Sequence, residues 1–479
     1  MAALTDTTSP GAGVTPTARP PSPWLLVAPL GIALALLPPV ATLPLALGLI
    51  GATVLLGRPR WSLYLLALTV PYQGLLDVTI DDIRLSITEG VVALLLLAWV
   101  TQVLTRRARP VPSSPLLGVI AALLVCFMLT VFVAPELNLA AKEMLKWMEL
   151  AAVFVAGSSL LETPAQRRTL LVWLLGAGAS QAIVGLLQSA LRIGPGHFMI
   201  GGVVMRAYGS FEQPNPFGGY MGLSVPLAVS LAAFGLPPGR ARRAAITVAI
   251  LTGTGLLLTF SRGAWVAQIV ALLLVLCIGS VQARQVLTAG SVFLVILFTA
   301  LWPLLPGELT ERLRSVVVSA LDLPGARDAV VTPENWAVQE RLSQWYAGWR
   351  MFLDNPILGV GIGNYNAAYD VYRLEQWPVA LGHAHNHYLT IAAEAGFAGF
   401  LMFVLLWVTV FRACAVAIRT APGRLERATA IGILSSLAAF ATHNLFDVLF
   451  VHGMGVTLGL LLTLLHGAPH GLSDPNRRP

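Results

Sequence analysis

Runs of about 20 apolar residues recur along the chain from Trp24 almost to the C-terminus. A helix of that length crosses the hydrocarbon core of a bilayer, which is about 30 Å thick. The composition agrees, because 56% of the 479 residues are hydrophobic and only 11% are charged, whereas a soluble domain carries about 25% charged residues. The pattern therefore excludes a water-soluble enzyme and predicts an all-α polytopic membrane protein.

Hydropathy predicts fourteen membrane spans, and the count falls to twelve or thirteen if short neighbouring runs merge. We therefore expect about 12–14 transmembrane helices with one large structured loop. The predicted spans cover residues 24–38, 40–57, 61–76, 89–105, 115–133, 145–162, 169–191, 216–236, 244–261, 264–283, 286–306, 388–411, 428–447 and 449–467.

These spans divide the chain into five parts with different surroundings. Residues 1–23 are rich in Pro, Thr, Ser, Gly and Ala, a composition that predicts a disordered tail. Transmembrane helices 1–11 are expected within 24–306 and the C-terminal transmembrane helices within 388–467, followed by a tail at 468–479. Residues 307–387 form the large loop, and since structureless loops of that length are uncommon, we expect it to be folded.

Basic residues indicate which side of the membrane each loop faces. With the N-terminus placed inside, eighteen of the 30 Lys and Arg residues fall in inside segments and six fall near short outside loops. Six more lie in the large loop, which the positive-inside rule does not count. The asymmetry predicts that both tails are cytoplasmic and that the large loop lies outside the cytoplasm.

The large loop contains one segment with a clear helical period. Leu342, Trp345, Tyr346, Trp349 and Phe352 follow i, i+3, i+4, i+7 spacing, which predicts an amphipathic helix with an aromatic stripe. Such a stripe suits the membrane interface, where Trp and Tyr are enriched. Packing of the stripe against the helices of the protein itself is the alternative interpretation.

Three arginines on the outside are candidate functional residues, because a charge near the membrane is costly unless a group pairs with it. Arg262 lies in a turn between two apolar runs, and snorkelling toward lipid headgroups is the alternative. Arg206 precedes a loop dense in Gly and Pro, in which the amides of Gln213 and Asn215 can face an oxygen-rich ligand or belong to a plain turn. Arg341 opens the amphipathic segment, where a solvated charge is the alternative. Converging guanidinium groups are suited to a diphosphate.

The densest ionisable cluster is Gly382-His-Ala-His-Asn-His-Tyr388. Imidazoles can ligate zinc or copper, but no carboxylate or thiolate stands beside them in the sequence, so we expect no metal site. Proton transfer by one histidine is the better interpretation, since imidazole titrates near neutrality. His443 and Asp447, at i and i+4 near the end of a predicted span, could orient that histidine or pair inside the bundle.

A glycine-rich segment, Gly359-Val-Gly-Ile-Gly-Asn-Tyr365, superficially resembles a nucleotide-binding loop. That motif needs a strand before it and a helix after it in a soluble parallel-sheet unit, a context that this chain lacks. We therefore interpret the segment as a tight connection.

His385 and Asn386, followed by nine residues, Gly396, two residues and Gly399, resemble the motif of the bacterial O-antigen ligase and O-antigen polymerase superfamily. Further segments that resemble these proteins lie at 206–217, 261–263 and 341–363. The resemblance covers roughly residues 200–460. It is specific because these segments occur in this order and lie on one predicted face of the protein.

The resemblance implies a GT-C-type glycosyltransferase of the bacterial inner membrane, with a periplasmic active site, that acts in lipopolysaccharide biosynthesis. Its donor would be an O-antigen glycan on polyprenyl (undecaprenyl) diphosphate, and its acceptor a hydroxyl of a lipid-linked sugar such as lipid A-core. Membrane lipids are expected partners, and nucleic acid and cofactors are not. His385 takes the position of the essential histidine of the family, and Arg262 and Arg341 take those of two essential arginines. Arg206, Gln213, Asn215 and Asn386 are expected to bind substrate.

The resemblance also implies a mechanism, which is an inverting and metal-independent displacement. His385 would accept the proton of the attacking hydroxyl, and the arginines would stabilise the leaving diphosphate.

Three alternatives remain open. The first is a polymerase that joins lipid-linked repeat units and shares the motif. The second is a polysaccharide transporter or flippase, for which many spans and interior charges are also ordinary. The third is a metal-dependent oligosaccharyl transferase that uses Asp77, Asp81 and Asp82 in an earlier outside loop.

Overall fold

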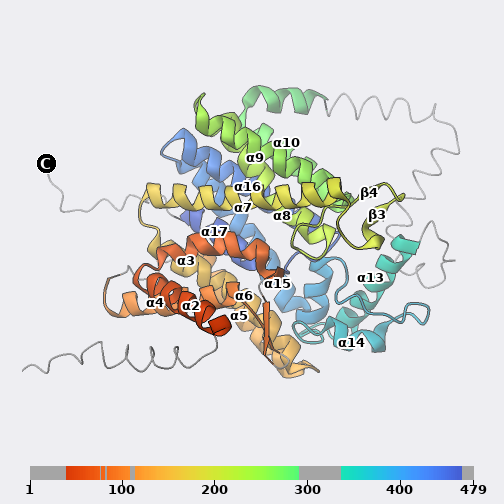
Figure 1. The fold of residues 1–479 in the computed structure, drawn as a ribbon. Helices are drawn as coiled ribbons and strands as arrows, with labels where there is room; N and C mark the ends of the chain where they lie inside the picture. Colours follow the sequence, from red (N-terminus) through yellow and green to blue (C-terminus); the bar gives the residue numbers. More distant parts are fainter. Residues whose placement is uncertain (1–38, 76, 81–82, 108–113, 291–335, 467–479) are drawn as a thin grey trace, which may run out of the picture. The chain divides into compact units, whose positions relative to one another are not determined.

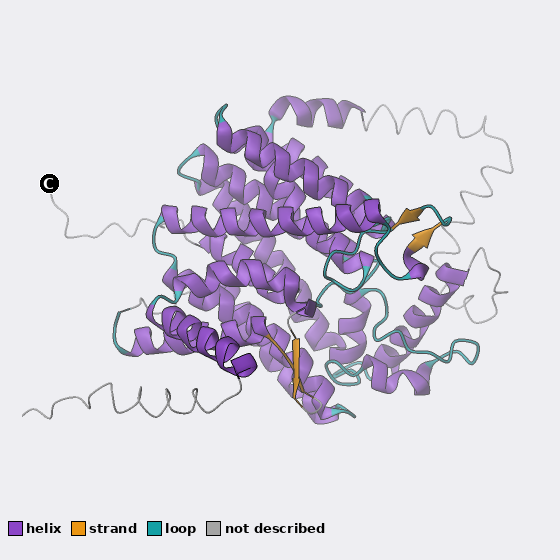
Figure 2. Ribbon diagram, viewed as in Figure 1, coloured by secondary structure: helices purple, strands orange, loops and turns teal. Residues whose placement is uncertain are grey.

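The computed structural model describes residues 39–75, 77–80, 83–107, 114–290 and 336–466. Most of these residues are helical, and two small strand pairs lie in loops (Figure 2). The chain divides into two units, Met1–Val54 and Leu55–Pro479, and every element after α2 belongs to the second unit. The predicted tails at 1–23 and 468–479 and the predicted span at 24–38 lie outside the described residues.

The described elements occur in the following order (Figure 1). The α-helices are α2 (Pro39–Gly57), α3 (Arg60–Thr69), α4 (Ile87–Leu104), α5 (Pro115–Thr130), α6 (Leu137–Leu160), α7 (Pro164–Leu191), α8 (Pro214–Ser230), α9 (Arg240–Leu257), α10 (Arg262–Gly279), α13 (Trp336–Asp354), α14 (Tyr365–Tyr372), α15 (His387–Thr420), α16 (Arg424–His443) and α17 (Met454–His466). The other helical segments are η1 (Val70–Leu75), η2 (Val131–Val133), η3 (Gly196–Phe198) and the π-helical turn η4 (Leu231–Gly235). The strands are β1 (Asp77–Ile80), β2 (Ile83–Ser86), β3 (Met199–Ile200) and β4 (Val204–Met205), and each pair is antiparallel.

Within the described residues, six helical segments are long and apolar enough to span a membrane. They are Ile87–Leu104, Pro115–Val133, Pro164–Leu191, Pro214–Gly235, Arg262–Gly279 and His387–Thr420. The polytopic all-α prediction is confirmed at this level. The predicted span at 286–306 lies mostly outside the described residues.

Several helix ends differ from the predicted spans. The helix predicted at 145–162 begins at Leu137, and the one predicted at 388–411 continues to Thr420. Charged residues inside these helices lower the local hydropathy, so a prediction from hydropathy makes the helices too short. The helix predicted to end at 447 ends at His443, so Asp447 lies in the turn that follows and does not share a helix face with His443.

The candidate span Pro214–Gly235, which contains α8, is the most buried of the six. In its apolar 18-residue stretch, 83% of the residues are buried inside the protein. Its glycines explain this, because small residues let helices approach closely. A Cβ on Gly219 would lie 2.8 Å from a methyl of Leu449, and one on Gly235 would lie 2.9 Å from Cβ of Ala428. Since Asn215 at the start of α8 bonds Asp447 after α16, and Gly235 meets the start of α16, the two helices run antiparallel.

The alternation of helix directions places a defined set of helix ends together. The starts of α8, α10 and α15 and the end of α16 lie at one end of the bundle, because hydrogen bonds join the residues that flank them. We call this the histidine end. Helix α16 has 20 residues, so its start lies about 30 Å away.

The part of the large loop that the structure describes, residues 336–387, is folded. It comprises α13, α14 and the loops around them, which lie at the same end as the start of α15 (Figure 1). Small and polar residues of α13 face the protein interior, and Gln344, Ala347 and Met351 are buried. Trp349 of the aromatic stripe is 43% exposed, whereas Leu342 is buried. The outer part of the stripe is therefore free to meet a membrane interface.

The glycine-rich segment attaches this folded loop to α15. Helix α15 is kinked at Gly396, where φ is 62° and ψ is −164°, a region that only glycine populates readily. The kink frees carbonyl groups, and the N–H groups of Val360 and Gly361 donate to the carbonyls of Ala393 and Glu394 at 2.9 and 3.0 Å. We call this contact, between residues 359–363 and 393–396, the seam. The glycine segment is thus a connection, as predicted.

Glu394 completes the seam, and the sequence analysis did not single it out. Its buried carboxylate accepts hydrogen bonds from the N–H groups of Gly363, at 2.9 Å, and Tyr365, at 3.0 Å. A carboxylate at the start of α14 satisfies helix N–H groups that would otherwise lack partners. An acidic residue within an apolar run was the available signal.

Candidate functional site

The histidine loop leads directly into α15. Asn386 is the N-cap of this helix, and its side-chain oxygen accepts from the N–H of Leu389 at 3.2 Å. His385 precedes it in a left-handed conformation, with φ of 51°. This conformation is uncommon for a residue with a Cβ and marks a constrained position. The cap and the left-handed turn fix the direction in which the His385 side chain leaves the helix start.

His385 and Asp447 form the central pair of the site. Nδ1 of His385 lies 3.2 Å from Oδ1 of Asp447, and the two side chains are 20% and 8% exposed. An ionised carboxylate only accepts hydrogen bonds, so Nδ1 carries the proton and Nε2 keeps a lone pair. The pair therefore orients an imidazole that can act as a base through Nε2.

Asp447 stays ionised although it is buried. Burial alone would raise the pKa of this carboxyl, but the hydrogen bond from His385 and electrostatic interactions with the neighbouring histidines hold the pKa well below its usual range. The N–H of Val448 also donates to Oδ1, at 2.9 Å. Asp447 is thus a fixed negative charge beside the imidazole.

His383 lies against the same pair in a neutral form. Its Nδ1 accepts a hydrogen bond from the backbone N–H of His385 at 3.1 Å, and its Nε2 lies 4.0 Å from Oδ1 of Asp447. Burial, and then the proximity of His385, lower the pKa of His383 to about 4. His383 therefore supports the loop and does not carry charge at neutral pH.

A chain of hydrogen bonds connects Asp447 to Arg206. Nδ2 of Asn215 donates to Oδ2 of Asp447 at 2.7 Å, and Oδ1 of Asn215 accepts from the Arg206 guanidinium at 3.3 Å. Arg206 also donates to the carbonyl of Thr259 at 2.7 Å. These bonds join the β4–α8 loop, the α9–α10 turn and the loop after α16 around one carboxylate.

Arg262 and Arg341 lie at the same end. Arg262 is the first residue of α10 and is exposed, and the Ser261 hydroxyl before it lies 3.5 Å from Nε2 of His443 at the end of α16. Arg341 on α13 is close enough to interact electrostatically with both Arg206 and His443. The structure therefore brings the three predicted arginines and His385 to one end of the bundle.

Within the part of the chain that the structure describes, the arginines at this end have no carboxylate partner. Burial, and then the nearby charge of Arg341, lower the pKa of Arg206. Among the described residues, none of Arg206, Arg262 and Arg341 forms an ion pair with a carboxylate. Like charges held close together without a counter-charge attract an anion. This arrangement suits a phosphate-bearing ligand.

The structure shows what surrounds three of the residues that were predicted to bind substrate, Asn215, Gln213 and Asn386. The amide of Asn215 is engaged on both sides by Arg206 and Asp447 and therefore organises the site. Gln213 is the exposed N-cap residue of α8, and its side chain makes no capping hydrogen bond. Asn386 uses its side-chain oxygen as a helix cap. Substrate contact by Asn215, Gln213 and Asn386 remains a prediction.

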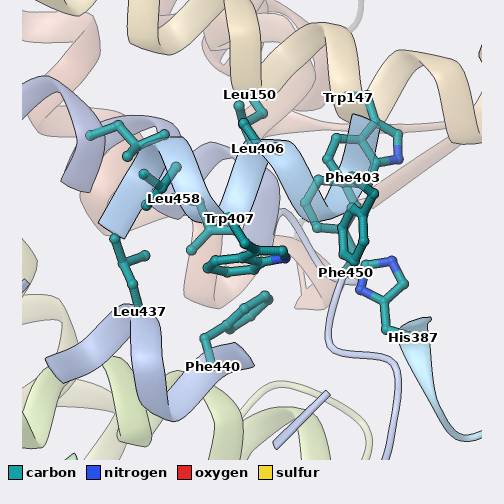
Figure 3. Close-up of a pocket in the computed structure, with 12 residues that line it drawn as sticks. Trp147, Leu150, His387, Phe403, Leu406, Trp407, Leu437, Phe440, Phe450 and Leu458 are labelled. Atoms are coloured by element: carbon teal, nitrogen blue, oxygen red, sulfur yellow. The ribbon is translucent and has the colours of Figure 1, made fainter. Parts of the chain in front are cut away.

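His387, the third histidine of the cluster, does not join the other two. It is buried beside a pocket between α6, α15, α16 and α17, where its ring lies 5.1 Å from that of Phe403 and 5.9 Å from that of Phe450 (Figure 3). Trp147 and Phe450 stack in the same wall, with ring centroids 4.1 Å apart. The cavity is about 30 Å³, room for about one water. His387 is therefore part of a packed aromatic wall behind the site.

The structure brings together three potential metal ligands, including a carboxylate that is not near the histidines in the sequence. His383, His385 and Asp447 each offer one ligand atom, and these atoms lie within 4.8 Å of one another. Two imidazoles and a carboxylate are donors that suit zinc. The same three groups are fully accounted for by the hydrogen bonds of a neutral His383 and a His385–Asp447 pair. Asp77 begins β1, and Asp81 and Asp82 lie outside the described residues.

The fold and the site define a multi-pass helical membrane protein with a histidine–carboxylate pair and unpaired arginines at one end of the bundle. Residues 247–404 match the family model described as O-antigen ligase (Wzy_C). This match covers about a third of the chain and supports the superfamily that its motifs resemble. The matched segment includes Arg262, Arg341 and His385.

Two further comparisons add little. Comparison with curated proteins gives no match. Among solved structures, a chain from "Structural coordination of polymerization and crosslinking by a peptidoglycan synthase complex" is similar over 73% of this chain and 95% of that chain. The identity is 18% and the TM-score is 0.41, too low to carry a statement about fold or function.

Proposed function

We propose that this protein is a ligase-type glycosyltransferase of the bacterial inner membrane that moves a glycan from a polyprenyl diphosphate to a hydroxyl of a lipid-linked sugar. The observation that carries the proposal is the His385–Asp447 pair, set among three arginines that form no ion pair among the described residues. One group is suited to remove a proton, and the others to hold a leaving diphosphate.

The reaction is a single displacement. The acceptor hydroxyl transfers its proton to Nε2 of His385 as its oxygen attacks the anomeric carbon of the donor glycan. The bond between that carbon and the diphosphate oxygen breaks with inversion, and both bonding electrons leave with the diphosphate. Arg262 and Arg341 stabilise the negative charge that develops there, so that no general acid is required.

The remaining groups position the base. Asp447 holds His385 in the tautomer whose Nε2 faces the acceptor, and it stabilises the imidazolium that forms. Asn215 and Arg206 hold Asp447 in turn. No step requires a metal ion, although His383, His385 and Asp447 could hold one.

We also propose that the histidine end faces the periplasm. The described loops at the opposite end contain arginines that the positive-inside rule assigns to the cytoplasm, including Arg240, Arg243 and Arg424. A lipid-linked donor then meets the site at the membrane surface.

The proposal is tested by incubating the purified protein with a polyprenyl-diphosphate glycan and candidate lipid-linked acceptors and sizing the products. Transfer of one long glycan intact onto the acceptor supports a ligase. Growth of a chain by one repeat per step would indicate a polymerase, and movement of intact lipid-linked glycan across vesicles without a product would indicate a transporter. Activity that disappears with a chelator and returns with a divalent cation would refute the metal-independent mechanism.

A further inference from the structure

A second charged cavity lies at the end of the bundle opposite the histidines. It is enclosed by the start of α7, the end of α15, the start of α16 and the end of α17. The cavity is about 110 Å³, several times the volume of the aromatic pocket beside His387. We call it the basal cleft. It shares no residue with the histidine site.

The rim of the basal cleft carries an excess of positive charge. Arg167 and Arg168 lie in the first turn of α7, and Glu426 lies in the first turn of α16. Arg168 pairs with Glu426 at 3.0 Å, while Arg167 donates only to the carbonyl of Glu162, at 3.5 Å. One carboxylate thus faces two guanidinium groups.

The start of α16 adds to the attraction for an anion. Gly423 is its N-cap and provides no side-chain hydrogen bond, while Glu426 in the first turn accepts from its own backbone N–H. Pro422 and Leu425 on either side of this cap line the cleft. A helix N-terminus carries partial positive charge.

The interior of the basal cleft is apolar. Below the rim it is lined by aliphatic residues of all four helices, among them Leu171, Ala417, Ile433 and Leu464. Glu426 at the rim and Ile433 in the interior are seven residues apart on α16, a depth of about 10 Å. A cavity of this kind accepts an alkyl chain at one end and a charged group at the other.

We propose that the basal cleft binds one anionic phospholipid, with its phosphate at Arg167 and Arg168 and the upper part of an acyl chain between Leu171 and Ile433. Basic pockets between membrane helices bind anionic lipid headgroups. The excess positive charge at the rim disfavours a zwitterionic lipid. This site is independent of the proposed transferase activity.

The test uses the full chain purified in uncharged detergent and follows its thermal unfolding during titration with phosphatidylglycerol. Phosphatidylcholine with the same acyl chains and free glycerol 3-phosphate are titrated in parallel. We expect phosphatidylglycerol to raise the unfolding midpoint and the other two to have no comparable effect. Equal stabilisation by phosphatidylcholine, or by glycerol 3-phosphate alone, would overturn the proposal.

Two variants locate the site. Arg167→Gln with Arg168→Gln should require roughly tenfold more phosphatidylglycerol for the same shift. The matched control, Arg240→Gln with Arg243→Gln, removes two exposed arginines at the same end of the bundle and should respond like the wild type. An equal response of both double variants would overturn the assignment.

A steric variant keeps the test decisive if the loss of Arg168 impairs folding. Ala417→Phe leaves every charge in place and fills the apolar interior. It should abolish the selective response to phosphatidylglycerol. A response that persists in this variant would show that the lipid binds elsewhere.

Discussion

Replacing Asp447 by Asn tests the hydrogen-bond network around the proposed base. The two oxygens of Asp447 accept three hydrogen bonds, from His385, Val448 and Asn215. Asn at this position keeps one acceptor oxygen and presents an NH₂ group in place of the other. Asn215 cannot compensate by turning its amide over, because its own oxygen already faces the Arg206 donor. The substitution therefore forces one donor against another.

The size of the effect follows from this mismatch. A buried donor left without an acceptor costs about 1–3 kcal/mol, and 1.36 kcal/mol in a barrier is a factor of ten in rate. If the mismatch falls on His385, the imidazole loses its tautomer and its orientation. We expect glycan transfer by Asp447→Asn to fall roughly 10- to 100-fold or more. The free energy of unfolding should fall by about 1–3 kcal/mol.

A double variant separates hydrogen bonding from charge. Combining Asp447→Asn with Asn215→Asp moves the carboxylate one position along the chain of hydrogen bonds and restores an acceptor for every donor. Thermal stability should return to near the wild-type value, while transfer recovers only in part because the charge no longer adjoins the imidazole. Asp370→Asn, an exposed acid on α14, is the matched control. Wild-type turnover by Asp447→Asn, or no recovery of stability in the double variant, would refute the reasoning.

Three further outcomes follow from the site and the seam. His385→Ala and Arg262→Ala should each abolish transfer in a product-sizing assay while membrane expression stays normal; residual turnover near the wild-type rate would contradict their roles. His383 is neutral in the fold because its pKa is lowered to about 4, so the unfolded chain binds more protons between about pH 6.5 and 4. Stability should therefore fall by about 1–3 kcal/mol as the pH drops through that range, less steeply in His383→Gln, and parallel curves would be the contrary result. Gly396→Ala should lower stability by about 1–3 kcal/mol or more, since its Cβ would lie 2.3 Å from the carbonyl oxygen of Ile357. Gly118→Ala, at an open helical position, should be nearly neutral.

Hydropathy predicted most of the membrane helices, because a long apolar run has few structural alternatives in lipid. Helix ends were less accurate where charges interrupt the run, as at the start of α6, which includes Lys142 and Lys146. The strand pairs β1–β2 and β3–β4 were not predicted, because strands of two to four residues are too short for an alternating pattern. The amphipathic helix was predicted correctly, since its period of 3.6 extends over several turns.

The candidate site was predicted less completely than the fold. Spacing and resemblance identified His385 and the arginines, and they do lie at one end of the bundle. The hydrogen bond from Asn215 to Asp447 joins residues that are 232 positions apart, and no local pattern reports such a pair. The motif identified His385 but gave no role to the other two histidines, and the start of α15 directs His387 into an aromatic wall while His383 stays with His385 beside Asp447.

The main-chain character of the seam has an evolutionary consequence. Arg341 belongs to the folded loop, and His385 directly precedes a membrane helix. Their relative positions are held largely by hydrogen bonds between backbone groups of residues 359–363 and 393–396. Peptide groups are the same in every sequence. The outward surface of α13 and α14 can therefore diversify to suit different glycans without disturbing the alignment of cation and imidazole, provided that the glycines at the contact are retained.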